Sequence, residues 1–370
     1  MSAPAAIPFI DLTPGADDDA AVRAAIDRVL ARGWFVLGPE VEAFEREFAA
    51  ASGARFAVAV GNGTDAIALA LRALGIGRGD EVIVPAMTAG YTALAVIAAG
   101  AAPVVVDVEP ETLTIDPRAC AAAVTPRTRA IVPVHLYGQP ADMSAVRGIA
   151  ARHSLAIVED CCQAHLATEN GVPVGTRSEA AAFSFYPTKN LGALGDGGAV
   201  ITGSDALAAR IRQLRNGGQR QRGTHLEAGV NSRLDDLQAA VLRARLPLLP
   251  QWTARRRALA ARYRQLLPAS LQTVRERDPG HVYHLFPVLT RERAALQAHL
   301  SAAGIETMVH YPAALNTQPA FAAYASHECP VAVGAASKLL SLPLSPRLTD
   351  DDIVRVADAA AAFVKGRHLE

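Results

Sequence analysis

Short β-branched runs alternate with Ala- and Leu-rich stretches of helical periodicity through the first two-thirds of the chain. The runs predict strands and the stretches between them predict helices. This alternation is typical of βαβ units, so we expect an α/β fold with a mostly parallel sheet between helices. The predicted strands are Phe56–Val60, Glu81–Val84, Pro103–Val108, Ala130–Val134, Ala156–Glu159, Ala181–Phe185 and Ala199–Thr202, and the predicted helices include Asp65–Leu74, Pro117–Val124, Met143–His153 and Ala206–Arg215.

The pattern changes in the last third of the chain. An Arg-rich amphipathic run, Asp235–Leu266, contains Pro247 and Pro250 and predicts a bent connecting helix. We therefore expect a large domain over residues 1–245 and a small C-terminal α+β domain over residues 246–370. The predicted elements of the small domain are a strand and two helices: Val282–Thr290, Glu292–Ala303 and Asp350–Val364.

The stretch from Val82 to Val106 carries no charge and is long enough to cross a membrane. Pro85, Gly90, Gly100 and Pro103 interrupt it, however, and much of it is Ala. It therefore predicts a strand, a helix and a strand inside a soluble core, and we expect no membrane contact.

Composition narrows the classes of function. Thirty-six Lys and Arg residues balance 36 Asp and Glu residues, which argues against a nucleic-acid partner. The four cysteines lack the spacing of a disulfide framework or a zinc site, and residues 1–18 lack the pattern of a signal peptide. We therefore expect a cytoplasmic protein without a bound metal.

A carboxylate and a lysine follow two of the predicted strands. Asp160 comes directly after Ala156–Glu159, at the carboxyl edge where open α/β sheets bind ligands. Lys189 lies 29 residues further on, in a loop after the apolar segment Phe183–Pro187. Burial there would lower the pKa of the lysine and make its amine a nucleophile toward carbonyls. The alternatives are a helix N-cap for Asp160 and a solvated surface charge for Lys189.

Pyridoxal phosphate needs such a pair, because a lysine holds its aldehyde and an aspartate keeps its pyridine ring protonated. The glycine-containing turn Gly61–Asp65 joins a predicted strand to a predicted helix and offers backbone N–H groups and the Thr64 hydroxyl to a phosphate. Ser184 is a second candidate phosphate donor. A capped helix start without a ligand, and a serine placed there only by strand alternation, stay open as alternatives.

Four segments of the chain resemble the cofactor site of the DegT family of sugar aminotransferases, which are fold-type-I pyridoxal-phosphate enzymes. They occur in the family's order and approximate spacing, and further similar segments extend over nearly the whole chain. The four segments are Asp160–His165, Ser184–Asn190, Gly195–Gly198 and Gly229–Asp235.

The resemblance implies a role for each matching residue. Lys189 forms the Schiff base with the cofactor, and Asp160 pairs with the pyridine nitrogen. Gln163 lies near the ring and its 3-hydroxyl. The resemblance further implies that the phosphate is bound by Ser184, by the backbone of Gly63, Thr64 and Asp65, by Asn231 of the partner subunit and by Arg233. A site shared between chains implies a homodimer.

One position departs from the family pattern. Many members carry an aromatic residue that stacks on the cofactor ring where this chain has Ala89. Tyr91, two residues later, is the nearest substitute and is interpreted as the stacking residue, with ordinary helix packing as the alternative.

The resemblance also implies the reaction. L-Glutamate would convert the cofactor to pyridoxamine phosphate, which would aminate a nucleotide-linked keto sugar, most similarly C3 of a dTDP-3-keto-6-deoxyhexose in amino-sugar or antibiotic biosynthesis. Tyr186, Arg220, His310 and Tyr311 are the candidate substrate contacts. The alternatives are an inosose-type cyclitol, a 4-keto nucleotide sugar and, remotely, a non-catalytic regulator that binds the cofactor. A nicotinamide-dependent oxidoreductase is disfavoured, because Gly61–Thr64 lacks the third glycine of that fingerprint.

Overall fold

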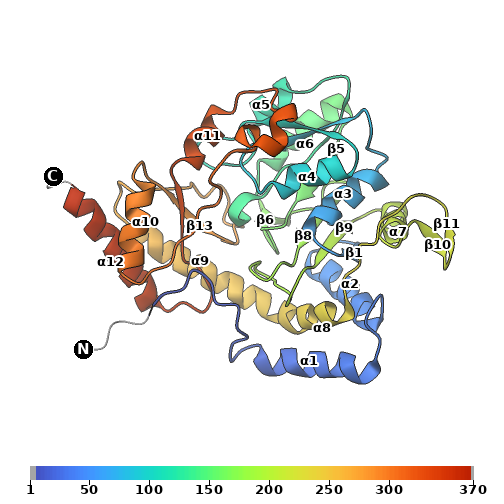
Figure 1. Ribbon diagram of the computed structural model, residues 1–370, viewed down its shortest axis with the longest axis horizontal. Coiled ribbons are helices and arrows are strands. Elements are labelled where there is room, and N and C mark those ends of the chain that lie inside the picture. Colours follow the sequence, from blue (N-terminus) through green and yellow to red (C-terminus); the bar gives the residue numbers. More distant parts are fainter. Residues whose placement is uncertain (1–5, 368–370) are drawn as a thin grey trace.

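A seven-stranded sheet forms the centre of the computed structural model, which describes residues 6–367 (Figure 1). Strand β9 runs antiparallel to both of its neighbours, and the other neighbouring pairs are parallel. The prediction of a mostly parallel mixed sheet is therefore confirmed. In spatial order the strands are β1 (Phe56–Val60), β9 (Gly198–Thr202), β8 (Ala180–Ser184), β5 (Ala156–Asp160), β4 (Thr128–Ile131), β2 (Glu81–Pro85) and β3 (Ala102–Val106).

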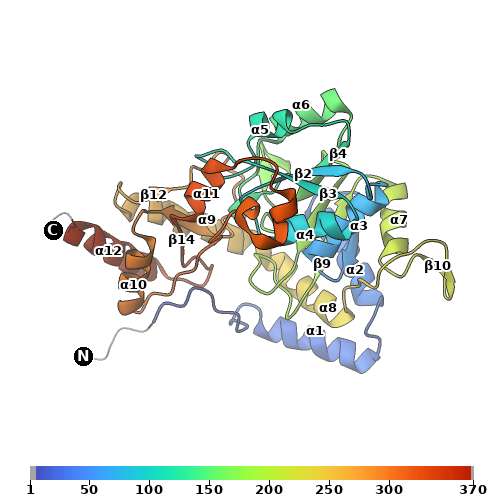
Figure 2. The ribbon, with the colours of Figure 1, turned by 45° about the horizontal axis from the view of Figure 1, so that its top comes forward.

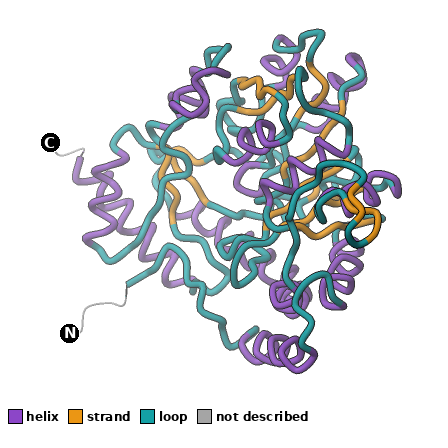
Figure 3. The backbone as a smooth tube through the Cα atoms, turned by 45° about the vertical axis from the view of Figure 1, so that its right-hand side comes forward, coloured by secondary structure: helices purple, strands orange, loops and turns teal. Residues whose placement is uncertain are grey.

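Helices cover both faces of this sheet, because alternate strand residues point to opposite faces and nearly all are apolar. In β1, Val58 and Val60 pack on one side, and Ala57 and Ala59 pack on the other. The first face is covered by α3 (Gly63–Ala73), α4 (Tyr91–Ala98) and α7 (Asp205–Leu214), and the second by α2 (Pro39–Ala51), α5 (Pro117–Ala122), α6 (Met143–His153) and α8 (Asp236–Arg245). Figure 3 shows the helices around the strands.

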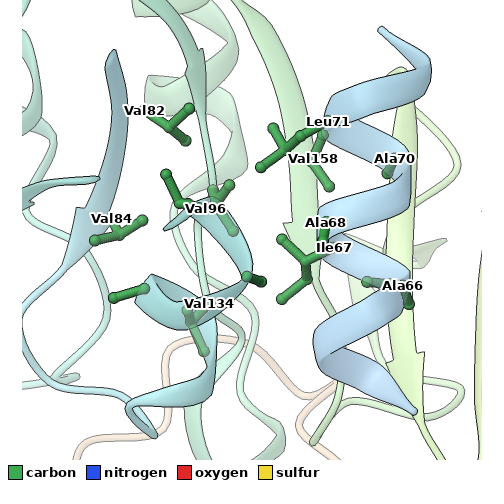
Figure 4. Packing of buried hydrophobic residues seen from close by; sticks show 14 of the residues in the cluster. Ala66, Ile67, Ala68, Ala70, Leu71, Val82, Val84, Val96, Val134 and Val158 are labelled. Atoms are coloured by element: carbon green, nitrogen blue, oxygen red, sulfur yellow. The ribbon is translucent and has the colours of Figure 1, made fainter. Parts of the chain in front are cut away.

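The packing of α3 on the sheet fixes the position of its N-terminus. Ile67 and Leu71 point from α3 toward the strands and lie near Val158 of β5 (Figure 4). All three side chains are at most 1% exposed. Full burial of a side chain of this size contributes about 1.5–3 kcal/mol. The first turn of α3 is thereby held beside the carboxyl ends of the strands.

The uncharged stretch is the β2–α4–β3 unit, as predicted. Among residues 6–367 no helix combines the length and the apolarity that crossing a membrane requires.

Three predicted strands are shorter than expected, and the first of them, β3, ends at Val106 and not at Val108. β4 ends at Ile131, because Pro133 has no N–H to continue the ladder. The strand expected over 282–290 is reduced to β13 (Phe286–Leu289). Tyr283 has a φ of +47°, and the backbone N–H groups of Val282 and His284 donate instead to Gly138 and Tyr137.

Much of the chain after residue 245 forms a second layer around a three-stranded sheet, at the left of Figures 1 and 2, whereas residues 314–336 pack on the core of the large sheet. The predicted bent helix is present, and a 3-10 turn, η2 (Leu246–Leu248), separates α8 from α9 (Leu249–Leu266). The proposed domain boundary at residues 245 and 246 falls at this turn. The sheet contains β12 (Gln272–Thr273), β13 and β14 (Leu339–Leu342), and it packs with α10 (Arg293–Ala302) and α12 (Asp350–Arg367).

The remaining elements have no counterpart in the predicted set. They are α1 (Asp19–Arg32), α11 (Pro330–Ala336), the hairpins β6 (Thr168–Glu169) with β7 (Val172–Pro173) and β10 (Gln219–Gln221) with β11 (Thr224–His225), and the 3-10 turns η1 (Leu136–Gly138), η3 (Leu315–Thr317) and η4 (Pro319–Tyr324).

Candidate active site

The carboxyl ends of β5 and β8 lie side by side, because the two strands are parallel neighbours. β5 ends at Asp160 and β8 ends at Ser184. The turn after β8 carries Lys189, whose backbone N–H donates to the Tyr186 carbonyl at 2.8 Å. Three of the predicted site residues therefore meet at one edge of the sheet, where α/β proteins bind ligands.

Asp160 is buried and receives a hydrogen bond at each carboxylate oxygen. The Cys162 N–H donates to Oδ1 at 3.1 Å, and the Thr92 hydroxyl donates to Oδ2 at 2.8 Å. Thr92 is in turn hydrogen-bonded to Thr88 at 2.9 Å. Residues 161–167 form turns and no helix, so the alternative reading of Asp160 as a helix N-cap is wrong.

Lys189 is a partly buried lysine, as its apolar surroundings predict. Burial lowers the pKa of its ammonium, and the nearby Cys162 and Asp160 side chains partly oppose that shift. The alternative of a fully solvated charge is therefore wrong. The chain contains two other lysines, Lys338 and Lys365. A depressed pKa leaves more of the amine neutral and nucleophilic near pH 7.

The first turn of α3 approaches β8 at a glycine. A Cβ atom on Gly63 would lie 2.7 Å from the Cys162 Sγ and 2.8 Å from the Ser184 Cβ. The Asn62 side chain caps the helix by accepting from the Asp65 N–H at 2.8 Å. The N–H groups of Gly63 and Thr64 therefore stay available at the positive end of the helix dipole, next to Ser184.

The Asp65 N–H, one of the predicted phosphate donors, donates to the Asn62 side chain in this structure. The Asp65 carboxylate accepts from the Ser232 hydroxyl at 2.6 Å, and Ser232 also accepts from the Gly61 N–H at 2.9 Å. Asp65 thus ties the segment that carries Asn231 and Arg233 to the turn before α3. Of the three predicted backbone donors, Gly63 and Thr64 remain.

Gln163 connects the sheet edge to the C-terminal layer. Its Oε1 accepts from the Tyr137 N–H at 2.6 Å, so its amide orientation is set and its Nε2 donates to the Tyr311 hydroxyl at 2.9 Å. The Tyr137 hydroxyl donates to the His310 carbonyl at 2.6 Å. The structure therefore brings Gln163, His310 and Tyr311 together, as the sequence predicts.

His310 is held as a neutral imidazole. Burial lowers its pKa to about 4, with a further contribution from the positive charge of Lys189. Its Nδ1 is 3.0 Å from the Ser341 hydroxyl, and its ring stacks on Phe9 with a centroid separation of 5.7 Å. Burial also raises the pKa of Tyr311, which therefore stays protonated and able to donate near neutral pH.

Five predicted contacts lie outside this cluster within the single chain. Tyr91 begins α4 and its side chain is 66% exposed, and Tyr186 is 51% exposed. Asn231 is exposed, and the Arg233 guanidinium donates to the Asn216 side chain at 3.2 Å. Arg220 is exposed on the β10–β11 hairpin, which projects from the molecule at the end opposite α10 and α12 (Figures 1 and 2).

Sequence reasoning missed Thr88, Thr92 and Tyr137. The two threonines are 2% exposed and belong to the segment that leads into α4. Thr92 lies in the first turn of α4 whereas Thr88 precedes the helix, so helical spacing gave no signal that the two hydroxyls meet. Tyr137 has a φ of +60° and gave no signal either.

These residues fit pyridoxal phosphate. Lys189 offers an amine for the aldehyde and Asp160 offers a carboxylate for the pyridine nitrogen. Gly63, Thr64 and Ser184 offer donors for the phosphate, at a point where α3 approaches β8 so closely that only glycine fits at position 63. The donor set thus matches the three polar ends of the cofactor.

Comparison with known proteins decides the family. The model of the DegT/DnrJ/EryC1/StrS aminotransferase family matches residues 16–361. The chain belongs to this family. It is a pyridoxal-phosphate-dependent aminotransferase, and both the expected family and the expected cofactor are confirmed.

Members of the DegT/DnrJ/EryC1/StrS family resemble the chain over most of its length. The dTDP-3-amino-3,4,6-trideoxy-alpha-D-glucose transaminase of Streptomyces venezuelae is 51% identical, over 97% of this chain and 96% of that protein. The erythromycin biosynthesis sensory transduction protein EryC1 of Saccharopolyspora erythraea is 50% identical, over 97% of this chain and 99% of that protein. The crystal structure of NtdA from Bacillus subtilis with bound cofactor PMP has a TM-score of 0.91 and 33% identity, and covers 98% of this chain and 86% of that one.

Proposed function

We propose that this aminotransferase moves an amino group from L-glutamate to C3 of a dTDP-linked 3-keto-6-deoxyhexose. The observation that carries the chemistry is the partly buried Lys189 amine beside Asp160, next to the donors of Gly63 and Ser184. The similarity to a transaminase named for a dTDP-3-amino sugar supports the choice of acceptor.

Each polar group of the cofactor is assigned to different residues. Asp160 holds the ring nitrogen, Gln163 holds the 3-hydroxyl through its Nε2, and Gly63, Thr64 and Ser184 hold the phosphate. When bound, pyridoxal phosphate supplies an electron sink for the charge that develops at the reacting carbon.

Lys189 moves the protons in this proposal. Its Nζ takes the proton from the α-carbon of L-glutamate in the first half-reaction and delivers a proton to C3 of the sugar in the second. This work needs an amine whose pKa lies below that of a free lysine, and burial provides that shift. The turn after β8 carries the amine, so its position does not depend on the arriving substrate.

Neutral donors line the approach to this amine. His310 and Tyr311 enter from the C-terminal layer, and the neutral state of both suits the hydroxyl and keto groups of a sugar. Tyr186 is exposed beside the same turn. These three residues are the proposed substrate contacts of the chain's own site.

The homodimer is part of the proposal. Asn231, Arg220 and Tyr91 are exposed, and the Arg233 guanidinium is bonded to Asn216 and not to Asp160. This placement supports roles at the site of a second subunit, in which Asn231 of the partner subunit contacts the phosphate. Trp34, Phe35 and Val36 are 40–57% exposed and offer apolar surface for such a contact.

The proposal places the protein in the cytosol. All four cysteines are free, and three of them are buried, which suits a reducing compartment.

The test follows the two half-reactions separately. Holoenzyme treated with L-glutamate should lose the visible absorption of its cofactor, and a dTDP-3-keto-6-deoxyhexose should restore it after the donor is removed. Restoration by an inosose or a 4-keto sugar instead would correct the acceptor. Absence of any amino transfer, with cofactor bound, would favour a regulatory role such as the name of EryC1 suggests.

A further inference from the structure

A chain of hydroxyl groups ends on the carboxylate that the proposed function assigns to the ring nitrogen. Thr88 Oγ1 lies 2.9 Å from Thr92 Oγ1, which lies 2.8 Å from Asp160 Oδ2. Both threonines are 2% exposed, and Asp160 is 5% exposed. Water therefore does not compete for these bonds.

The direction of the two hydrogen bonds is fixed by chemistry. An ionised carboxylate only accepts, so the single hydroxyl proton of Thr92 is donated to Asp160. The Thr92 oxygen is then the acceptor toward Thr88, and Thr88 must be the donor. Donors that follow one another in this way polarise each other and strengthen the terminal bond.

The residues at the two ends of this hydrogen-bonded series come from different parts of the sheet. Asp160 ends β5, while the threonines follow β2, and β4 lies between the two strands. Thr92 lies in the first turn of α4, and Thr88 is four residues earlier. The Cys162 N–H holds the other carboxylate oxygen at 3.1 Å. Donors at both oxygens restrict rotation of the Asp160 carboxylate about its Cβ–Cγ bond.

We propose that Thr88 and Thr92 form a positioning relay that orients the Asp160 carboxylate toward the ring nitrogen of the cofactor. This inference rests on the function proposed above for Asp160. Neither threonine touches the reacting atoms, so both act through Asp160. The relay keeps one lone pair of the carboxylate aimed at the ring, where a charge-assisted hydrogen bond is most sensitive to direction.

The test measures the ring nitrogen itself. Holoenzyme is prepared with pyridoxal phosphate that carries 15N in its ring, and the 15N chemical shift is recorded for the parent protein, Thr92→Val and Thr92→Ser. Valine keeps the shape of threonine and removes the hydroxyl, whereas serine keeps the hydroxyl. The rate of the L-glutamate half-reaction is measured on the same samples.

The relay predicts a changed 15N shift in T92V and a half-reaction slower by about tenfold. In T92S the shift should return toward the parent value, with recovery of most of the lost rate. An unchanged shift in T92V, with a rate within about twofold of the parent, would overturn the relay. Equal impairment of T92S and T92V would overturn it as well, because the hydroxyl would then be irrelevant.

Thr88→Val provides a second, independent variant in case T92V fails to fold by circular dichroism. It leaves the Thr92–Asp160 bond in place and removes only the donor behind it. The relay predicts a 15N change in the same direction as in T92V and a rate loss of about threefold. A T88V protein identical to the parent in both measurements would contradict the relay.

The Asp160→Asn variant separates the assignment of Asp160 to the ring nitrogen from the relay proposed for the threonines. If D160N leaves the 15N shift at the parent value, the assignment of Asp160 to the ring nitrogen fails. If D160N changes the shift and the threonine variants do not, the assignment stands and the relay alone fails.

Discussion

A buried carboxylate, Glu40, and a partly buried amine, Lys189, have opposite surroundings. Glu40, at the start of α2, is 1% exposed and accepts from Arg28 at 2.9 Å, Arg32 at 3.2 Å and Arg243 at 2.6 Å. The hydrogen bond from Arg28 contributes most to the pKa of Glu40, which is lowered to about 2. Lys189 is attracted to Asp160 and Cys162 only at longer range, and burial lowers its pKa.

The difference separates a structural charge from a reactive one. Three guanidinium groups hold Glu40 ionised, and they join α1, α2 and α8. Lys189 is desolvated without equivalent compensation, which destabilises its charged form. A buried ionisable group left in that state is a candidate for chemistry, and its position at the sheet edge strengthens the assignment.

The largest expected effect comes from removal of the reactive amine. Lys189→Ala should retain bound cofactor and lose transaminase turnover by at least about a thousandfold, because no other side chain replaces the amine. Steady-state kinetics with glutamate and the keto sugar measure this loss. Lys338→Ala is the matched control, since Lys338 lies directly before β14 and has no assigned role at the site, and it should keep parental kcat. Near-normal turnover of K189A would refute the assignment.

A larger side chain at position 63, where α3 approaches β8, should weaken cofactor binding without changing Lys189 or Asp160. In Gly63→Ala the new methyl group meets Cys162 and Ser184 below 3 Å, so α3 or β8 must shift. Overpacking of this kind costs about 1–3 kcal/mol, and a cost borne entirely by the cofactor site would raise the cofactor Kd about 5- to 150-fold. Fluorescence titration of apoenzyme gives the Kd. Gly203→Ala serves as control, because nothing lies within 4 Å of a Cβ there. Equal Kd values for the two variants would contradict the assignment of the Gly63 turn to the phosphate.

Loss of the Glu40 charge should lower the stability of the fold and leave the two half-reactions unchanged. Glu40→Gln leaves three guanidinium groups without their carboxylate and should lower the free energy of unfolding by about 2 kcal/mol in urea titrations. Glu47 pairs with the same Arg243 but its side chain is 41% exposed, so Glu47→Gln should cost less than about 1 kcal/mol. Loss of turnover in folded E40Q would contradict the purely structural role of Glu40.

A smaller effect is expected in the acid range. The pKa of His310 is about 4 in the folded chain, below the ordinary value of 6.5, because of burial and then the charge of Lys189. Below pH 6.5 the unfolded chain therefore binds a proton that the folded chain excludes, and stability falls until about pH 4. In His310→Gln the decline in unfolding free energy of the apoenzyme between these pH values should be shallower. Parallel pH profiles for H310Q and the parent would contradict the neutral assignment.

The sheet was largely predictable because its strands are buried on both faces and read as apolar runs. The errors lie where the backbone leaves that pattern, as at Pro133 and Tyr283. Helix α1 was not predicted, and it buries only Val22, Ala25 and Val29. Such a narrow apolar stripe gives the sequence little periodicity from which to predict a helix. The helix α1 is stabilised by packing against α8.

The site was predictable where a residue ends a strand or lies in the turn after it. Asp160, Ser184 and Lys189 are of this kind, because parallel strands bring their carboxyl ends to one edge. The contact between Gln163 and Tyr311 spans 148 residues, and the contact between Thr92 and Asp160 depends on the order of β5, β4 and β2. Neither the side-chain partners nor the strand order can be read from local pattern.

The most direct test of the central claim is to identify the lysine that bonds the cofactor. Borohydride reduction of holoenzyme fixes the bond, and mass spectrometry of the digested protein locates the pyridoxyl group among the three lysines of the chain. The account predicts the group on Lys189. A group on Lys338 or Lys365 in its place, or an unmodified Lys189 in cofactor-saturated protein, would contradict it.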